Sequence, residues 1–156
     1  MSQLIKLMVD IEVVKEQQGT SRLIFLGDFN MNPYDSGMNL ASGLNAMMTK
    51  ECVKRGYRTY GGEQYDLYYN PMWGLFGDNT KGPAGTVYDT SSQGPYGWSM
   101  FDQVIIHHSA VELFEDVEIL DRIGTTSLAN RKGHPDSSNL SDHFPILVKL
   151  GGDSYE

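Results

Sequence analysis

The stretch Leu23-Ile24-Phe25-Leu26-Gly27-Asp28-Phe29-Asn30 joins four consecutive apolar residues to a glycine, a carboxylate and an amide. A short continuous apolar run predicts a strand that is buried on both faces, as in the middle of an α/β sheet. The glycine then lets the chain turn. The predicted strand therefore ends in Asp28, at a position where a sheet can direct side chains into a cleft.

A helix is expected on each side of this strand. Apolar residues recur at spacings of three and four in residues 3–17, which predicts a helix with one buried face. The residues of that face are Leu4, Leu7, Met8, Ile11 and Val14. Residues 36–55 predict a second, looser helix that Gly56 ends. Its inward residues are expected to be Leu40, Leu44, Met47, Met48 and Cys52.

Strands are expected in the second half of the sequence. Residues 101–107 and 111–120 are strand-like and are expected to pair with each other, and residues 144–150 predict the last strand. Between residues 57 and 96 the chain is rich in Gly, Asn, Pro and Tyr, which is typical of functional loops. This order of elements predicts an α/β or α+β fold.

Length and composition indicate one globular domain. The chain has 156 residues, and the domain is expected over residues 1–150 with a tail over residues 151–156. No apolar stretch approaches the ~20 residues of a membrane helix. A net charge of −8 argues against a broad basic surface for nucleic acid, and it fits ordinary surface charge or carboxylates around a divalent cation. The first residues lack a signal-peptide pattern, so the localisation stays open, with the cytoplasm as the default.

Asp28 and Asn30 form the first candidate pair for chemistry. A carboxylate at the end of a buried strand is unfavourable unless it is ionised next to a partner or a metal. If the backbone stays extended, Asn30 points to the same side as Asp28. The carboxylate could then hold or deprotonate a water, and the amide could donate to a phosphoryl oxygen. The alternative is a turn in which one of the two side chains caps the following segment.

Asp142 and His143 stand directly before the last predicted strand. A histidine can donate to a phosphate or act as a general acid when a second hydrogen bond fixes its tautomer. Asp102 is the candidate partner of His143, because it also lies at a strand boundary. Asp142 would then be available to hold a metal ion or its water. The alternative for His143 is an ordinary imidazole at the edge of the core.

The motifs GDFN (27–30), FDQVI (101–105) and SDHFPI (141–146), in this order, resemble those of the endonuclease/exonuclease/phosphatase superfamily, which has the deoxyribonuclease I-like fold. The resemblance implies half of a four-layer α/β sandwich, with one mixed, mostly antiparallel sheet and helices on one face. It also implies a hydrolase of the nuclease, phosphodiesterase or phosphatase type that uses Mg²⁺ or Mn²⁺.

The resemblance also implies a role for each matching residue. Asp28 would hold the attacking water and Asn30 would bind the scissile phosphate. Asp142 would bind the metal. His143 would contact the phosphate, with Asp102 supporting its ring.

The chain departs from the family in length. Members are about twice as long, and their first half supplies an Asn, a metal-binding Glu and commonly a His or Tyr. Asp10, Glu12 and Glu16 lie on the first predicted helix and are expected to face solvent instead. The chain therefore resembles the C-terminal half of the domain. We expect a truncated piece of a longer Mg²⁺-dependent hydrolase, with weak metal binding and weak or no activity by itself. The alternatives are a noncatalytic structural or interaction module and an unrelated α/β domain.

Other residues are weaker candidates. His107 and His108 could bind metal, but neighbours on a strand point to opposite faces, so a surface role is expected. Trp98 is the candidate for stacking on the substrate, from an aromatic-rich group that could equally pack a loop onto the sheet. That group is Tyr65, Tyr68, Tyr69, Trp73, Tyr96 and Trp98. The loop residues Lys81, Arg131 and Lys132 could contact phosphate.

The expected partners are a phosphate-ester substrate and a second protein surface. The substrate could be a nucleic acid, a phospholipid headgroup or a small molecule. One sheet face is expected to lack a cover, and its residues are Ile24, Leu26, Val104, Ile106 and Leu147. Such a face favours self-association, or pairing with the missing N-terminal half.

Overall fold

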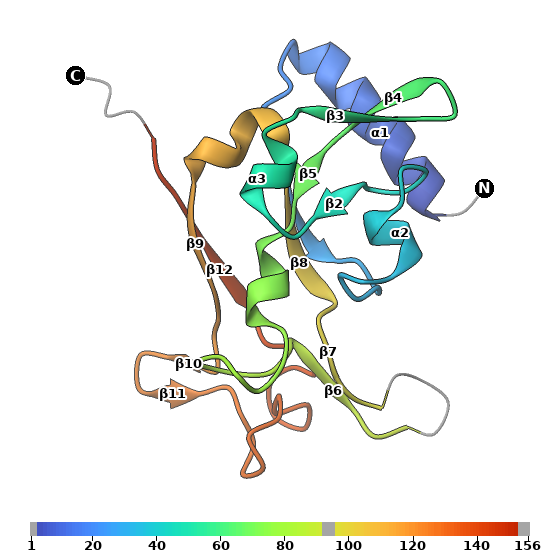
Figure 1. Ribbon diagram of the computed structural model, residues 1–156. Coiled ribbons are helices and arrows are strands. Elements are labelled where there is room, and N and C mark those ends of the chain that lie inside the picture. Colours follow the sequence, from blue (N-terminus) through green and yellow to red (C-terminus); the bar gives the residue numbers. More distant parts are fainter. Residues whose placement is uncertain (1–2, 92–95, 153–156) are drawn as a thin grey trace.

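A four-stranded mixed sheet lies at the centre of the computed structural model, which describes residues 3–91 and 96–152 (Figure 1). Its strand order is β1 (Ile24–Asp28), β8 (Asp102–His107), β5 (Tyr68–Tyr69) and β2 (Ala46–Met47). Only β2 and β5 run parallel. The expected tail, residues 151–156, lies largely outside the described residues. The fold is α+β.

The remaining strands form four two-stranded sheets rather than extensions of the central one, so the prediction of a single sheet is wrong. They pair antiparallel as β3 (Tyr57–Tyr60) with β4 (Glu63–Asp66), β6 (Val87–Asp89) with β7 (Gly97–Ser99), β9 (Phe114–Ile119) with β12 (Ile146–Leu150), and β10 (Arg122–Ile123) with β11 (Thr126–Ser127). The 3₁₀ helices are η1 (Pro71–Leu75) and η2 (His108–Leu113).

The predicted pairing of residues 111–120 with residues 101–107 is also wrong. Instead, β9 pairs with β12, the last strand of the chain. The cause is η2, which turns the backbone directly after β8 and carries β9 away from the central sheet (Figure 1).

Helix α1 (Gln3–Gln18) covers one face of the central sheet, close to the predicted bounds. Ile11 is buried in a cluster with Ile105 and Tyr68, and Phe25 packs against it. Gly19 ends the helix with a φ of 59°. Val14, expected to face inward, is 41% exposed, because the helix presents only a narrow stripe to the sheet. No helix in the described part of the chain is long and apolar enough to cross a membrane.

The second predicted helix is wrong. Residues 36–55 contain two short helices, α2 (Ser36–Asn39) and α3 (Lys50–Val53), with β2 between them. Gly43 packs so closely on the backbone of Gly37 that no Cβ would fit, and Asn45 has a φ of 51°. Neither feature suits a continuous helix. As a result Leu40, Met48 and Cys52, which were expected to face inward, are exposed.

The opposite face of the central sheet is covered, contrary to expectation. Val104 and Ile106 are completely buried with Met72, Met100 and Val117. The cover comes from η1 and from the β9–β12 pair, which folds back over this face. The chain therefore supplies much of the layer that was expected to be missing.

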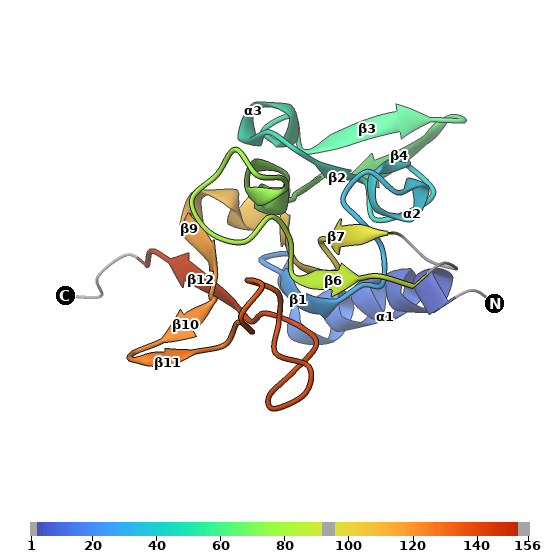
Figure 2. The same cartoon turned by 90° about the horizontal axis from the view of Figure 1, so that it is seen from below.

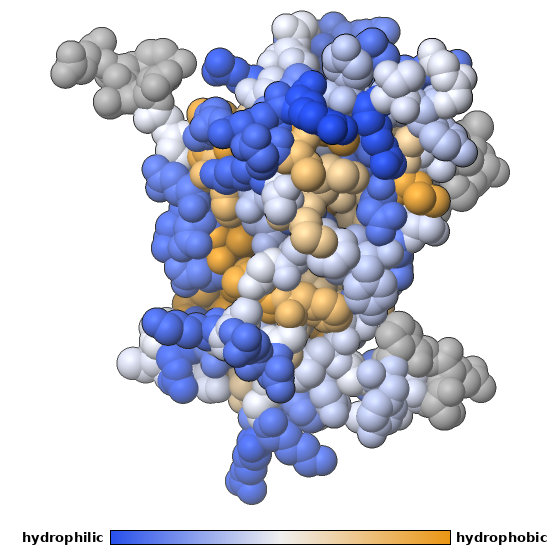
Figure 3. Space-filling view, viewed as in Figure 1, coloured by the Kyte–Doolittle hydropathy of each residue, from blue (hydrophilic) through white to orange (hydrophobic). Residues whose placement is uncertain are grey.

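Parts of the predicted bare face do remain accessible. Leu26 is 58% exposed and Leu147 is 43% exposed. Leu26 lies on β1, which is an edge strand rather than the buried central strand that its apolar run predicts. Apolar residues also gather over the middle of the face shown in Figure 3, between hydrophilic residues above and below.

We expect Gly85→Ala to destabilise the fold, because a Cβ at Gly85 would lie 2.6 Å from the carbonyl oxygen of Ser99. Such overpacking typically costs about 1–3 kcal/mol. Gly74→Ala is the matched control, since nothing lies within 4 Å of a Cβ at that position. Chemical denaturation measures both variants. Equal midpoints for Gly85→Ala and the unaltered chain would contradict the close approach of Gly85 to Ser99.

Candidate active site

Asp28 and Asp102 lie opposite each other at one end of the central sheet. The antiparallel register of β1 and β8 pairs Ile24 with Ile106 and Asp28 with Asp102. Figure 2 shows this end, where β6, β7 and the segment that leads to β12 also meet. Residues far apart in the sequence are therefore brought together at the strand tips, as the motifs predict.

Asn30 reaches Asp28 by a turn, not by an extended strand. Its φ is 50°, its backbone N–H donates to Oδ1 of Asp28 at 2.8 Å, and its side-chain amide donates to Oδ2 at 3.3 Å. The assumption of an extended backbone at Asn30 is thus wrong. Asp28 caps a turn, which is the alternative that the sequence left open for this pair. The side chains of Asp28 and Asn30 are both exposed.

His143 and Asp102 form the hydrogen bond that the sequence predicts. Nδ1 of His143 lies 2.7 Å from Oδ2 of Asp102. A carboxylate can only accept, so Nδ1 carries the proton in this bond. The side chains are 28% and 20% exposed, which leaves the pair partly open to solvent. Within the described part of the chain, Nε2 of His143 has no hydrogen-bond partner, so it is available for a ligand.

The charges around His143 favour its protonated form. Burial acts to lower the pKa of His143, but the hydrogen bond to Asp102 and the charges of Asp102, Asp142 and Asp28 outweigh it. The net effect raises the pKa of His143 above its ordinary value. The site can therefore present a positively charged donor among carboxylates.

Thr86 positions both members of the His143–Asp102 pair. It is fully buried, and its Oγ1 accepts from the backbone N–H groups of Phe101 and Asp102, each at 3.1 Å. Its carbonyl oxygen accepts from the N–H of Phe144 at 2.8 Å. One threonine therefore joins the start of β8 to the segment that carries His143. The sequence gives no sign of this role, because the three backbone groups that Thr86 contacts come together only in the folded chain.

A buried amide cluster supports the other side of the site. Gln103 is fully buried and donates to the carbonyl of Met31, directly after Asn30. Its Oε1 accepts from Asn70 at 2.7 Å, and Asn32 accepts from the N–H of Met100 at 2.8 Å. The signal that could have found Gln103 is its position, since an amide inside an apolar strand must find partners.

Asp142 lies beside His143 but is exposed. It lines a hollow of about 350 Å³ together with Phe101, Asp89 and Ser137. Among the residues that the structure describes, it does not belong to a group of three ligand side chains whose donor atoms lie within 4.8 Å of one another. A metal ion bound by Asp142 would therefore take its other ligands from water or substrate.

Trp98 packs in an aromatic cluster behind the site. Its ring stacks on Phe144 with centroids 6.2 Å apart and meets Tyr88 edge-on at 5.1 Å. His134 in turn stacks on Tyr88 at 3.5 Å. Trp98 is partly buried and packs these loops together, and it does not line the hollows that Asp142 and His143 border.

The other aromatic and basic candidates are scattered. Tyr68 is buried in the core and Tyr96 is 76% exposed. Lys81 lines a separate hollow beside Glu118 and Ile119 on β9. Arg131 and Lys132 are exposed in the turn after Asn130. None of these residues lines the hollows that Asp142 and His143 border.

His107 and His108 do not point to opposite faces, and His107 is buried, so the expected surface role is wrong for His107. The backbone leaves the extended conformation at His108, where η2 begins, and the two ring centroids lie 4.1 Å apart. Nε2 of His107 lies 3.1 Å from Oδ2 of Asp66, which also accepts from Lys15 at 2.8 Å. This second polar cluster lies at the opposite end of β8 from Asp102.

Comparison with known proteins adds no relative. A scan against protein-family models, a search of curated proteins and a search of solved structures each found no match to this chain.

We expect Asp102→Asn to lower the pKa of His143, because it removes the charge and weakens the hydrogen bond that raise it. Asp142→Asn is the matched control, and its effect should be smaller because it removes only a through-space charge. Nuclear magnetic resonance titration of the ring measures both. A folded-state pKa above the unfolded value also means that the pair stabilises the fold fully below about pH 6.5 and loses this contribution as the pH rises through the pKa of folded His143. An unchanged titration in Asp102→Asn would contradict the assignment.

Proposed function

We propose that this chain carries a phosphoesterase site of the endonuclease/exonuclease/phosphatase type, in which a water held by Asp28 attacks phosphorus. The observation that carries the proposal is the 2.7 Å bond between His143 and Asp102, placed at the same strand tips as Asp28. An oriented imidazole whose protonated form is favoured by neighbouring carboxylates is a suitable group for phosphate-ester hydrolysis.

Each side chain has a distinct role in the proposed reaction. Asp28 is anchored by Asn30, yet a carboxylate accepts up to about four hydrogen bonds, so it can still hold a water. Asn30 can turn its amide to a phosphoryl oxygen. His143, with Nδ1 held by Asp102, donates from Nε2 to the charge that develops on phosphate oxygens. Neighbouring carboxylates favour the protonated form of that donor, because they raise the pKa of His143.

The donor set fits a hard divalent cation. Mg²⁺ is commonly held by one or two carboxylates together with substrate phosphate oxygens and water. Asp142 can supply one carboxylate beside His143. When bound, Mg²⁺ or Mn²⁺ would supply Lewis-acid stabilisation of the leaving oxygen. Because a single carboxylate holds such an ion weakly, we expect weak binding of Mg²⁺ in the absence of substrate.

We expect Asp28→Asn and His143→Ala each to lower metal-dependent hydrolysis by about 10²–10⁴-fold, because each removes a proton-transfer or charge-stabilising group. Release of nitrophenolate from bis-p-nitrophenyl phosphate and p-nitrophenyl phosphate, with Mg²⁺ or Mn²⁺, measures the rate and separates diesterase from monoesterase activity. Asp116→Asn is the control, since Asp116 is an exposed residue of β9 that pairs with Lys149.

A noncatalytic role is the alternative, and the anchoring of both Asp28 oxygens by Asn30 favours it. The noncatalytic role would be supported by a chain that melts cooperatively but hydrolyses neither nitrophenyl phosphate ester faster than the metal ion alone does. Equal rates in Asp28→Asn and in the unaltered chain would also count against the catalytic proposal.

We further propose that the chain self-associates through the edge strand β1. An edge strand exposes backbone groups that a second copy can pair with, and Leu26 adds an exposed apolar side chain to it. Sedimentation at micromolar concentration should show a dimer, and Leu26→Lys should shift the equilibrium to the monomer. Leu40→Lys, at a residue of similar exposure away from β1, is the control. A monomeric unaltered chain would rule the pairing out.

A further inference from the structure

We propose that Asp66, His107 and His108 bind a transition-metal ion, with Zn²⁺ as the best match, at the end of the sheet opposite to the candidate active site. The three side chains offer ligand atoms that all lie within 4.8 Å of one another. Two imidazoles and one carboxylate are a donor set that suits Zn²⁺ and leaves positions for water or a further ligand.

The local fold explains why sequence neighbours can bind one ion. β8 ends at His107 and η2 begins at His108, so the two rings turn to the same side and lie 4.1 Å apart. Asp66 reaches them from the end of β4, just before Tyr68 pairs with His107 across β5 and β8. Three elements therefore converge on one point.

The spacing is close to that of a bound ion. With bonds of about 2.0–2.1 Å, the donor atoms around a tetrahedral Zn²⁺ stand about 3.3–3.4 Å apart. Nε2 of His107 and Oδ2 of Asp66 are 3.1 Å apart. His108 is only half-buried, so its ring can rotate to close the remaining gap.

The surroundings of His107 resemble the support of a metal-bound histidine. Nδ1 of His107 lies 2.8 Å from Oγ of Ser109, and that hydroxyl donates to the carbonyl of Ser21 at 2.9 Å. A metal-bound histidine donates its far ring N–H, and Oγ of Ser109 lies where it can accept that bond from Nδ1. In the metal-free chain the N–H of Ser109 donates to Nδ1 at 3.2 Å, so Nδ1 is an acceptor and Nε2–H donates to Asp66. Metal binding would move the ring proton from Nε2 to Nδ1.

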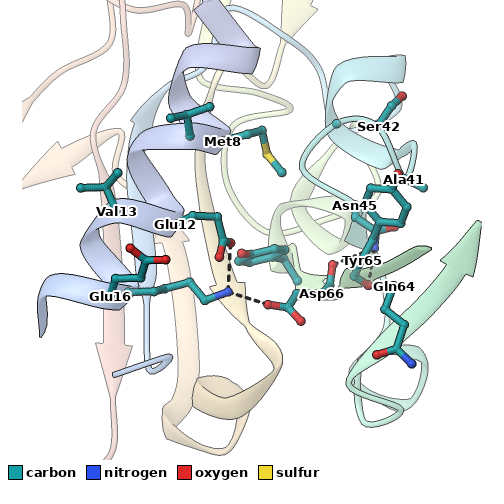
Figure 4. A pocket seen from close by; sticks show the side chains of 14 residues that line it. Met8, Glu12, Val13, Glu16, Ala41, Ser42, Asn45, Gln64, Tyr65 and Asp66 are labelled. Atoms are coloured by element: carbon teal, nitrogen blue, oxygen red, sulfur yellow. Dashed lines mark hydrogen bonds and ion pairs between the residues drawn. The ribbon is translucent and has the colours of Figure 1, made fainter. Parts of the chain in front are cut away.

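Lys15 competes with the ion for Asp66. Its ammonium donates to Oδ2 at 2.8 Å and to Glu12 at 3.0 Å. In Figure 4 these bonds are the dashed lines that end on Glu12 and Asp66, beside the pocket between α1 and β4. A cation bound by Asp66 would lie near this ammonium and be repelled by it. Lys15→Met should therefore strengthen metal binding, a result that a nonspecific histidine site would not give.

The proposed metal site is separate from the candidate active site. His107 lies five residues beyond Asp102 on β8, about 17 Å away at the rise of a strand. The ligands also differ, since Asp142 offers oxygen to a hard cation and the histidines offer nitrogen. The two sites can be tested independently, and this inference does not rest on the proposed phosphoesterase.

The test is calorimetric titration of the full chain with Zn²⁺ in millimolar Mg²⁺, combined with visible spectroscopy of added Co²⁺. We expect one ion per chain, and at least about tenfold weaker binding in His108→Ala and in Asp66→Asn. Lys15→Met should bind more tightly. His134→Ala and His143→Ala are the controls and should bind as the unaltered chain does.

Several results would overturn the proposal. They are the absence of saturable Zn²⁺ binding, unchanged affinity in a folded His108→Ala variant, and loss of the site in His143→Ala. Ring resonances of His107 and His108 should move together on titration with Zn²⁺. Movement of His143 or His134 alone would place the ion elsewhere.

Discussion

The antiparallel register between β1 and β8 is the constraint on which the candidate active site depends. It places Asp28 opposite Asp102, and a shift of one residue would turn every side chain of one strand to the other face. The apolar side chains of β8 alternate between the two faces of the sheet and so fix the register. Ile105 packs toward α1, while Val104 and Ile106 pack on the other face. The strand tips are therefore positioned by apolar packing on both sides of the sheet.

Two buried polar residues connect the end of the sheet to the loops of the candidate site by hydrogen bonds. Thr86 joins the start of β8 to the segment of His143, and Gln103 joins β8 to the carbonyl after Asn30. Buried polar groups of this kind are costly unless every partner is in place, so each bond selects one loop conformation. The side chains of the candidate site are exposed to different degrees, but the backbone beneath them is held by buried bonds.

The sequence predicted the parts of the fold that depend on local apolar patterns. α1, β1, β8 and β12 were found because their apolar residues follow the period of a helix or form short continuous runs. The Asp102–His143 bond followed from motifs at strand ends. Residues 36–55 were mispredicted because the close contact of Gly37 with Gly43 comes from tertiary folding, and apolar spacing alone gives no sign of it.

Long-range partners were harder to predict. The pairing of β9 with β12 depends on the turn in η2, and no pattern in residues 108–113 marks a 3₁₀ helix. The same turn invalidated the rule that His107 and His108 face apart, because that rule holds only while the backbone stays extended. Thr86 could not have been found at all, since its importance comes from three backbone groups that meet only in the folded chain.

The two imidazole–carboxylate pairs at opposite ends of the molecule show how the surroundings set the chemistry. At His143 the pair is partly open, and three carboxylates outweigh burial, so the pKa is raised. At His107 the ring is 1% exposed, and burial outweighs the bond to Asp66, with Lys15 and His108 acting in the same direction, so the pKa is lowered. The same pair of residue types is therefore shifted in opposite directions by its surroundings at the two ends of one chain.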